Sequence, residues 1–195
     1  MAAKLPGMPL EERKLVARAQ GGDRAAFEEL VRLHADHLHA VVLRLVGDRH
    51  EAEEVTQEAF LRAWRGIDGF KGDARFFTWL YRIGVNEARR SSQRRSGSRA
   101  VTSLEEHWID PRDPGPGPAG AAEHTDLRSA LEAAIAALHD DYRAPLVLRD
   151  VEGLSTAEAA DVMGLGEPAF KSRLHRARLA VRTAVEPYLP VQDER

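Results

Sequence analysis

The chain has 195 residues, of which 43% are hydrophobic and 30% are charged, and this composition is typical of a folded protein with apolar cores. It contains no cysteine, which excludes disulfides, thiol catalysis and cysteine-ligated zinc sites. Its formal net charge of -3 argues, as an average, against a freestanding DNA-binding protein.

The sequence shows no segment for export or membrane insertion. No apolar run approaches the roughly 18 residues that a membrane-spanning helix needs. The first residues, MAAKLPG, lack the apolar stretch of a signal peptide. We therefore expect a cytoplasmic protein with no membrane insertion.

Charge is strongly segregated along the chain. Residues 71–99 contain eight Lys or Arg against two Asp or Glu, and residues 168–182 contain five Lys or Arg and no acid. Residues 100–126, in contrast, contain six acids and one arginine. Because a uniform solvated surface would mix the two signs, the two basic blocks are candidate binding surfaces for an anionic partner.

An extended linker is predicted in the acidic stretch. Helical periodicity fails between residues 91 and 120, where prolines alternate with glycines. Each proline disfavours the helical conformation of the residue before it. The chain is therefore expected to form two small domains, residues 10–95 and 126–188, joined by a flexible acidic Pro/Gly linker over residues 96–125.

Apolar residues recur at spacings of three and four on both sides of the linker, which predicts helices. The expected helices are residues 27–46, 50–65 and 74–94 in the first domain and 130–138, 146–151 and two later segments in the second. No run of alternating β-branched residues indicates a sheet, so the predicted fold is all-α. The apolar positions of the first and fourth helices are Phe27, Leu30, Val31, Leu33, Leu38, Val41, Val42, Leu45 and Val46, and Ala130, Leu131, Ala134, Ile135 and Leu138.

An acidic and polar stripe is expected on the helix of residues 50–65. Glu54, Gln57 and Glu58 lie at positions i, i+3 and i+4, opposite the apolar side. Such a face would repel nucleic acid, whereas a basic protein partner could bind it. A solvated helix face is the alternative interpretation.

The segment of residues 74–95 combines arginines with aromatic side chains. Arg75, Arg82 and Arg89 are seven residues apart and so share one helix face. Exposed aromatic rings can stack on unpaired bases while cations hold the backbone. Phe76, Trp79 and Ile83 have the spacing of core residues, so the better candidates for nucleic acid are the basic face with Phe77 and the preceding loop.

A helix-turn-helix is predicted near the C-terminus. Ser155 and Glu158 form a capping box at the start of a helix, and Gly164 can adopt the left-handed conformation of a tight turn. Ala160, Gly164 and Phe170 stand at relative positions five, nine and fifteen of the motif, where a small residue, a turn residue and an apolar residue are needed.

The second helix of this motif has two different faces. Its apolar side contains Phe170, Leu174, Ala177 and Val181, and the other side contains Lys171, Ser172, His175, Arg176 and Arg178. A helix with an apolar back and a basic front fits the major groove of DNA. An ordinary amphipathic surface helix is the alternative, but such a helix usually includes acids, and residues 168–182 contain none.

Two other classes of protein fit the sequence less well. An enzyme is one of them, and the sequence has neither a glycine-rich phosphate loop with Lys-Ser/Thr nor a Gly-x-Ser-x-Gly nucleophile motif. His34, His37, His39 and His50 could suggest a metal site, but no acidic ligand is arranged with them, so no metal, cofactor or catalytic residue is expected. An autonomous helix-turn-helix regulator would leave the arginine-aromatic segment unexplained.

Four motifs together resemble a known family. Residues 54–60 (EVTQEAF) and 72–86 (GDARFFTWLYRIGVN) resemble region 2 of bacterial extracytoplasmic-function (ECF, group 4) sigma factors of RNA polymerase. Residues 146–155 (LVLRDVEGLS) and 171–178 (KSRLHRAR) resemble region 4 of the same family. The resemblance covers residues 23–95 and 126–183 in the family's order. It implies a protein that directs polymerase to promoters and assists promoter opening.

The resemblance also implies roles for three sets of residues. The acidic stripe of Glu54, Gln57 and Glu58 matches positions that bind the β′ clamp helices of the polymerase. A minus-ten set, which matches positions that open and hold the minus-ten DNA, consists of Lys71, Arg75, Phe77, Arg82, Asn86, Arg89 and Arg90. A minus-thirty-five set, which matches positions that contact the upstream element, consists of Arg149, Lys171, Ser172, His175, Arg176 and Arg178.

The partners that the resemblance implies are the polymerase core, through the β′ clamp helices and the β flap, and promoter DNA, with an anti-sigma factor as a further candidate. The chain departs from the family at Glu167-Pro168-Ala169-Phe170, where relatives usually have Val/Pro-Gly-Thr-Val. This change removes a hydroxyl near the phosphates and adds an acid. The resemblance therefore implies the family's mode of binding at the upstream element but not its sequence preference.

Overall fold

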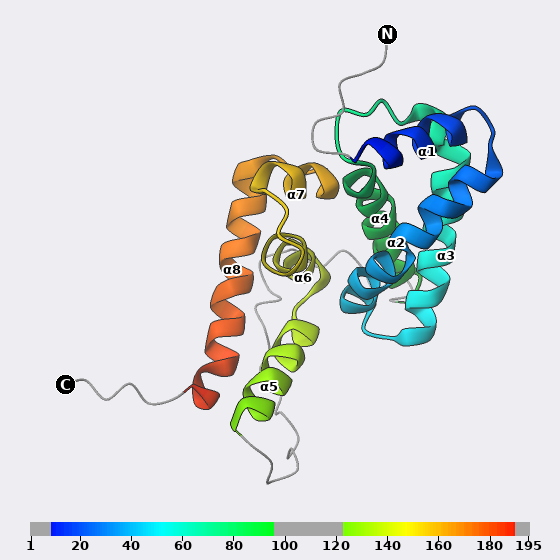
Figure 1. The fold of residues 1–195 in the computed structure, drawn as a ribbon. Coiled ribbons are helices and arrows are strands. Elements are labelled where there is room, and N and C mark those ends of the chain that lie inside the picture. Colours follow the sequence, from blue (N-terminus) through cyan, green and yellow to red (C-terminus); the bar gives the residue numbers. More distant parts are fainter. Residues whose placement is uncertain (1–8, 96–122, 190–195) are drawn as a thin grey trace.

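The computed structural model describes residues 9–95 and 123–189, and for residues 123–126 the backbone alone. These residues form helices and no strand, which confirms the predicted all-α fold (Figure 1).

We refer to residues 9–95 as the N-terminal half and to residues 123–189 as the C-terminal half. The N-terminal half contains α1 (Leu10–Gln20), α2 (Arg24–Val46), α3 (Arg49–Gly66), the 3-10 turn η1 (Ile67–Gly69) and α4 (Phe76–Arg95). The C-terminal half contains α5 (Glu123–Ala137), α6 (Asp140–Leu146), the π turn η2 (Val147–Val151), α7 (Thr156–Met163), α8 (Glu167–Val185) and the 3-10 turn η3 (Glu186–Tyr188).

Short polar side chains set the starts of α2 and α3. The carboxylate of Asp23 accepts a hydrogen bond from the backbone N–H of Ala26 at 3.1 Å, and that of Asp48 accepts one from Glu51 at 2.8 Å. Both bonds satisfy amides that have no partner within their own helix. Between the two helices, Gly47 has a φ of 76°, which a residue with a side chain rarely adopts. The turn from α2 to α3 is therefore encoded locally.

The core of the N-terminal half lies where α2 and α4 approach each other closely. Leu38 of α2 is fully buried, as are Phe76 and Leu80 of α4. A Cβ atom placed on Gly84 would lie 2.9 Å from Cδ1 of Leu38. Because that distance is shorter than van der Waals contact, a glycine at this position permits the close packing of the two helices.

The C-terminal half contains the predicted helix-turn-helix. Ser155 and Glu158 form the reciprocal capping box at the start of α7, and Gly164 ends the helix with a φ of 65°. Ala160 is 2% exposed and Phe170 is fully buried, so the small residue and the apolar residue pack the two helices together. The local features that predicted the motif are confirmed.

The two halves pack against each other, and α7 lies beside the first turns of α4 (Figure 1). Polar contacts cross between them as well. The guanidinium of Arg143 donates a hydrogen bond across the boundary to the backbone oxygen of Leu45 at 2.5 Å, and another within the C-terminal half to that of Leu138 at 2.6 Å. Removal of this guanidinium from water lowers the pKa of Arg143 below its usual value, although nearby Asp140 partly offsets the effect.

Some details differ from the predicted arrangement. Leu33 and Leu131, both assigned to apolar stripes, are 60% and 41% exposed. The predicted helix of residues 146–151 is a π turn that continues α6. Helix α5 begins at Glu123, while residues 96–122 of the predicted linker lie outside the described residues. None of the helices in residues 9–95 and 123–189 combines the length and apolar character that crossing a membrane requires.

Candidate functional site

The acidic stripe lies on α3, on the side away from the core. Glu54 and Gln57 are exposed, whereas Val55 on the opposite side is 4% exposed. Glu54 has one weak partner, His50, at 3.7 Å. These two side chains are therefore free to meet another molecule.

Glu58, the third member of the stripe, is joined to the helix beside it. Its Oε1 lies 2.9 Å from Nε of Arg62, and the same Nε lies 2.9 Å from Oε1 of Glu87 on α4. Oε1 of Glu87 also accepts a hydrogen bond from Arg90 at 2.5 Å. A chain of charges thus links the acidic stripe to Arg90, a member of the minus-ten set.

The minus-ten set lies on the loop before α4 and on the exposed side of that helix. Its exposed members are Lys71, Arg75, Arg82, Asn86 and Arg90, and its half-buried members are Phe77 and Arg89. Phe76 is buried and Trp79 is half-buried, in agreement with the interpretation of these two rings as core residues.

Two arginines of the minus-ten set are paired with the C-terminal half. Nη2 of Arg82 donates to the carboxylate of Asp161 at 3.1 Å. Arg89 donates to Asp141 and to the backbone oxygen of Met163, both at 3.4 Å. These contacts could not be predicted from periodicity, because Arg82 and Asp161 are 79 residues apart, and Arg89 is 52 residues from Asp141 and 74 from Met163.

Phe77 is enclosed by other rings. Its ring centroid lies 5.1 Å from that of His34, 4.7 Å from that of His37 and 4.0 Å from that of Tyr81. The ring is half-buried by these side chains of α2 and α4.

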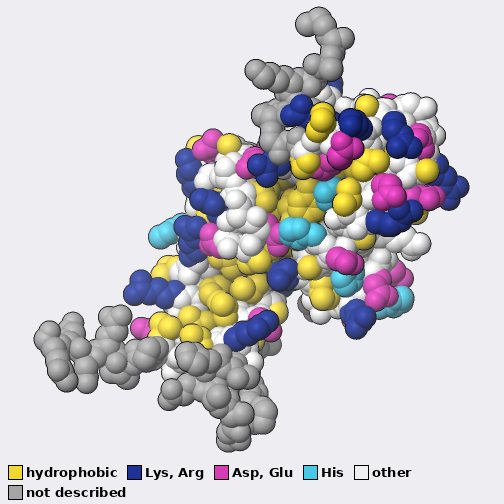
Figure 2. Space-filling model, viewed as in Figure 1, with side chains coloured by type: hydrophobic (Ala, Val, Ile, Leu, Met, Phe, Trp, Pro, Cys, Tyr) yellow, Lys and Arg dark blue, Asp and Glu magenta, His cyan; other side chains and the backbone are white. Residues whose placement is uncertain are grey.

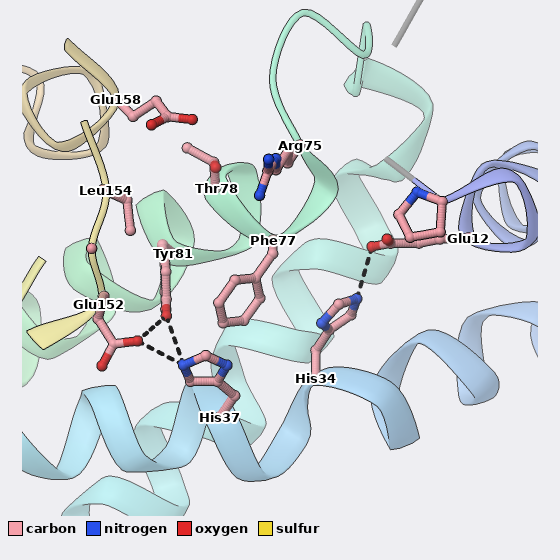
Figure 3. A pocket seen from close by; sticks show the side chains of 12 residues that line it. Glu12, His34, His37, Arg75, Phe77, Thr78, Tyr81, Glu152, Leu154 and Glu158 are labelled. Carbon is pink, nitrogen blue, oxygen red and sulfur yellow. Dashed lines mark hydrogen bonds and ion pairs between the residues drawn. The ribbon is translucent and has the colours of Figure 1, made fainter. Parts of the chain in front are cut away.

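A cavity of about 540 Å³ opens beside Phe77, between the two halves (Figure 3). Glu152 of the C-terminal half points to Tyr81 and His37 at its edge (Figure 3). The Tyr81 hydroxyl donates to Glu152 at 2.5 Å, and Nε2 of His37 lies 2.6 Å from the same carboxylate oxygen. Burial, together with the neighbouring Glu152, raises the pKa of Tyr81 above its usual value.

Five of the six members of the minus-thirty-five set lie on α8, and the sixth, Arg149, lies on η2. Lys171, Ser172, His175 and Arg176 are exposed, and Leu174 and Ala177 behind them are buried. Figure 2 shows Lys and Arg side chains along the edge of the molecule that α8 forms. The helix therefore has the basic front and apolar back that the sequence predicted.

Two other members of this set have partners within the C-terminal half. Arg178 donates to both carboxylate oxygens of Asp150, at 2.8 and 2.6 Å, and this bidentate contact raises the pKa of Arg178. Arg149 donates to the backbone oxygen of Leu154 at 3.0 Å. Both arginines thereby position the segment before α7.

The atypical Glu167 is paired with a cation of the basic face. Its carboxylate lies 3.0 Å from Nζ of Lys171, one helical turn further along α8. Because both side chains are about half exposed or more, the pair is weak and can exchange for other partners. The acid nevertheless lowers the positive charge at the N-terminal end of α8.

The histidines do not form a metal site in the described part of the chain. His34 lies 2.9 Å from Glu12, and His37 contacts Glu152. No group of three or more His, Asp or Glu side chains gathers there in a way that could hold a metal ion.

Comparisons with known proteins agree with the four sequence motifs. The family described as Sigma-70 region 2 matches residues 30–98, and the one described as Sigma-70, region 4 matches residues 128–181. The RNA polymerase sigma-H factor of Pseudomonas aeruginosa is 36% identical over 92% of this chain and 96% of its own length. The ECF RNA polymerase sigma-E factor of Escherichia coli is 34% identical over 92% of this chain and 97% of its own length.

A solved structure is similar in three dimensions as well. It is the sigma factor RpoE in complex with the anti-sigma factor NepR from Bartonella quintana. It has a TM-score of 0.58 and 26% identity to this chain, and the match covers 82% of this chain and 96% of the other. Family matches on both halves, with relatives similar over nearly their whole length, do not favour an autonomous regulator. The chain belongs to the sigma-70 family, as an ECF-type sigma factor that directs RNA polymerase to promoters.

Proposed function

We propose that three surfaces of this sigma factor have separate tasks. The acidic stripe of α3 binds the polymerase, the minus-ten set holds melted DNA, and the minus-thirty-five set on α8 binds the upstream element. The observation that carries the proposal is the separation of charge. An exposed acidic face lies on α3, and an exposed basic face, backed by buried apolar residues, lies on α8.

The acidic stripe suits a positively charged protein surface. Glu54 and Gln57 are exposed, so binding would not require the helix to unfold. DNA, in contrast, would be repelled by the carboxylates. We assign the stripe to the β′ clamp helices of the polymerase.

The minus-ten set suits single-stranded DNA. Arg75, Asn86 and Lys71 are exposed around the start and middle of α4. Flipping a base out of the duplex costs a few kcal/mol, which stacking and contacts to phosphates can offset. We assign Phe77 to stacking and the basic residues to the backbone of the melted strand.

The minus-thirty-five set suits duplex DNA. A helix with a basic front can read guanine edges through Lys or Arg and hold phosphates through its other polar groups. Arg176 lies near the middle of the exposed face of α8, and Lys171 lies near its start. Glu167 pairs with Lys171. We therefore propose that the choice between upstream-element sequences depends more on His175 and Arg176 than on Lys171.

The tasks proposed for the three surfaces also imply domain boundaries, partners and a location for the protein. We propose that residues 10–95 act as region 2, residues 96–125 as a linker and residues 126–188 as region 4, which also meets the β flap. The protein has no catalytic chemistry of its own and works in the cytoplasm, where the polymerase transcribes. An anti-sigma factor is a further proposed partner, supported by the similarity to RpoE, which was solved with NepR.

Run-off transcription with purified core polymerase on genomic fragments tests the proposal. We expect the chain to give transcripts from discrete start sites and to bind duplex DNA alone only weakly. If the polymerase were equally unselective with and without the chain, the assignment of all three surfaces would fail. Strong sequence-specific binding of duplex DNA without polymerase would favour the regulator instead.

A further inference from the structure

A hollow of about 350 Å³ lies where α3 and α4 meet, and most of the side chains that line it are arginines. Arg62 comes from α3, whereas Arg90 and Arg94 come from α4. Glu87 and Gln93 of α4 complete the lining. Arg62 and Arg94 belong to neither the acidic stripe nor the two DNA-binding sets, so the tasks proposed for those surfaces do not explain this hollow.

The buried carboxylate of Glu87 holds two of the three arginines in place. Its side chain is only 3% exposed, and its Oε1 contacts Nε of Arg62 and Nη1 of Arg90. These contacts use one nitrogen of each guanidinium, whereas a guanidinium has five N–H donors on three nitrogens. Because the two arginine side chains are 43% and 55% exposed, they keep donors for a ligand. Side chains that are already ordered also lose less conformational entropy when a ligand binds.

Arg94 is the third cation of the hollow. It is exposed and lies one helical turn after Arg90, which places it on the same side of α4. Its guanidinium has no hydrogen bond or ion pair with any residue of the ranges 9–95 and 123–189. The exposed amide of Gln93 lies beside it in the lining. The hollow thus contains one cation that the described residues leave unneutralised.

The charge and geometry of this group suit a phosphate. Its three arginines face two acids, Glu87 in the lining and Glu58, which pairs with Arg62, so the group has a net charge of +1. Arginine recognises the oxygens of both carboxylates and phosphates. A carboxylate presents two oxygens in one plane, whereas the tetrahedral oxygens of a phosphate can meet cations from three directions. A phosphodiester, moreover, has the single negative charge that the group lacks.

We propose that Arg62, Arg90 and Arg94 form a phosphate-binding site at the boundary of α3 and α4, in which Glu87 positions the first two arginines. The phosphate comes from the backbone of promoter DNA or from a small phosphate compound, which present the same group. The DNA source rests on the proposed role of the minus-ten set, because Arg90 belongs to that set and Asn86 precedes it by one helical turn on α4. In either case α3 contributes to the ligand as well as α4.

The test uses two variants of the site and one matched control. Arg94→Ala removes the unneutralised cation and breaks no contact among the described residues. Arg62→Lys keeps a positive charge beside Glu87 but removes the planar fork of donors. Arg65→Ala is the control, because Arg65 is an exposed arginine of α3 that lies outside the lining and has no partner in the described part of the chain. Circular dichroism and co-elution with core polymerase verify equal folding and assembly.

Two probes represent the two sources of phosphate. Inorganic pyrophosphate, titrated into the free chain by calorimetry, represents a small phosphate compound. A promoter fragment identified by run-off transcription, bound by the holoenzyme at several salt concentrations, represents DNA. We expect both site variants to bind at least one probe about two- to fivefold more weakly than the wild type and Arg65→Ala, the size expected for one partly exposed charge pair.

The DNA source predicts two further features of the loss. It should be the same for promoters of different sequence, because a phosphate carries no sequence information. Arg94→Ala should also reduce the slope of log affinity against log salt concentration by about one. A loss with pyrophosphate alone assigns the site to a small compound, and a loss with DNA assigns it to the backbone.

Wild-type binding of both probes by either site variant would overturn the proposal. An equal loss in Arg65→Ala would also overturn it, because a general loss of positive charge would then explain the result. Run-off transcription by the wild-type chain tests the proposed function separately. Its failure would remove the DNA source, while the pyrophosphate titration would still decide whether the three arginines bind phosphate.

Discussion

Nε of Arg62 on α3 lies 2.9 Å from Oε1 of Glu87 on α4, a carboxylate whose side chain is only 3% exposed. Arg90 is the second cation on the same oxygen. A buried carboxylate is costly unless it is paired. The two arginines therefore permit Glu87 to occupy the boundary between α3 and α4.

Replacing Arg62 should destabilise the N-terminal half. We expect Arg62→Ala to lower the free energy of unfolding by about 1–3 kcal/mol, because the buried Glu87 then keeps one of its two cations. Adding Glu87→Gln should recover part of the loss, since a neutral amide needs no counter-charge. Denaturant unfolding followed by circular dichroism measures both.

Arg49→Ala is the matched control for this prediction. Arg49 pairs with Glu53 on the surface of α3, and both side chains are more than half exposed. Its loss should change the free energy of unfolding by less than about 0.5 kcal/mol. If Arg62→Ala and Arg49→Ala cost the same, the pairing with Glu87 contributes nothing.

Reversing one charge of the acidic stripe should disrupt holoenzyme formation. Glu54→Lys places a cation against the basic surface proposed for the polymerase, and like charges that meet at an interface repel strongly. We expect at least tenfold weaker binding, or about 1.4 kcal/mol. Co-elution with core polymerase measures the loss, and Glu28→Lys on α2 is the control. Normal co-elution of Glu54→Lys would remove the stripe from the polymerase interface.

Arg176 and Arg178 should differ in their effect on promoter binding. Arg176 is exposed and has one long contact, 3.5 Å to the hydroxyl of Tyr142, whereas Arg178 is held by Asp150 through two short hydrogen bonds. We expect Arg176→Ala to cost about 1–3 kcal/mol of promoter affinity if this arginine reads a base. Arg178→Ala should cost less. Footprinting of the holoenzyme over the upstream element compares them, and equal losses would refute the distinction.

The capping box of α7 should give a pH-dependent contribution to stability. The Ser155 side chain and backbone lower the pKa of Glu158 below its usual value of 4.5. The stabilisation is therefore fully present above that value and is lost as the pH falls through the lower pKa of the folded state. Ser155→Ala should cost about 1 kcal/mol at neutral pH.

The cost of Ser155→Ala should shrink in acid. Thermal unfolding of the wild type and the variant at neutral pH and well below pH 4.5 measures the difference. Thr183→Ala, at an exposed position of α8, serves as the control. A difference that stays constant with pH would show that the hydrogen bond from the Ser155 hydroxyl to the Glu158 carboxylate contributes nothing to stability.

Features encoded by neighbouring residues were predictable from the sequence. The capping box of Ser155 and Glu158, the left-handed Gly164 and the buried Phe170 each depend on short spacings. The apolar and basic faces of α8 were predictable as well, because helical periodicity also depends on short spacings. Local hydrogen bonds and helix geometry need no knowledge of the rest of the fold.

Contacts between the halves could not be predicted in this way. Arg82 and Asp161 are 79 residues apart, and no periodicity relates them. Phe77 was predicted as a ring for base stacking, yet it is half-buried beside His34, His37 and Tyr81. Tyr81 itself is 1% exposed and donates to Glu152, a contact between residues 71 positions apart. Leu33 was assigned to the apolar stripe of its helix but is 60% exposed. A helix as long as α2 also carries some apolar residues on its solvent side.

Asp141 accepts from Arg173 of α8 at 2.9 Å as well as from Arg89 of α4 at 3.4 Å. One side chain thus contacts an arginine of α4 and an arginine of α8. A substitution at this position should therefore disturb both surfaces that we propose to bind promoter DNA. Phenotypes of Asp141 variants would therefore be pleiotropic, and assays that monitor a single element would assign to one region a defect that belongs to two.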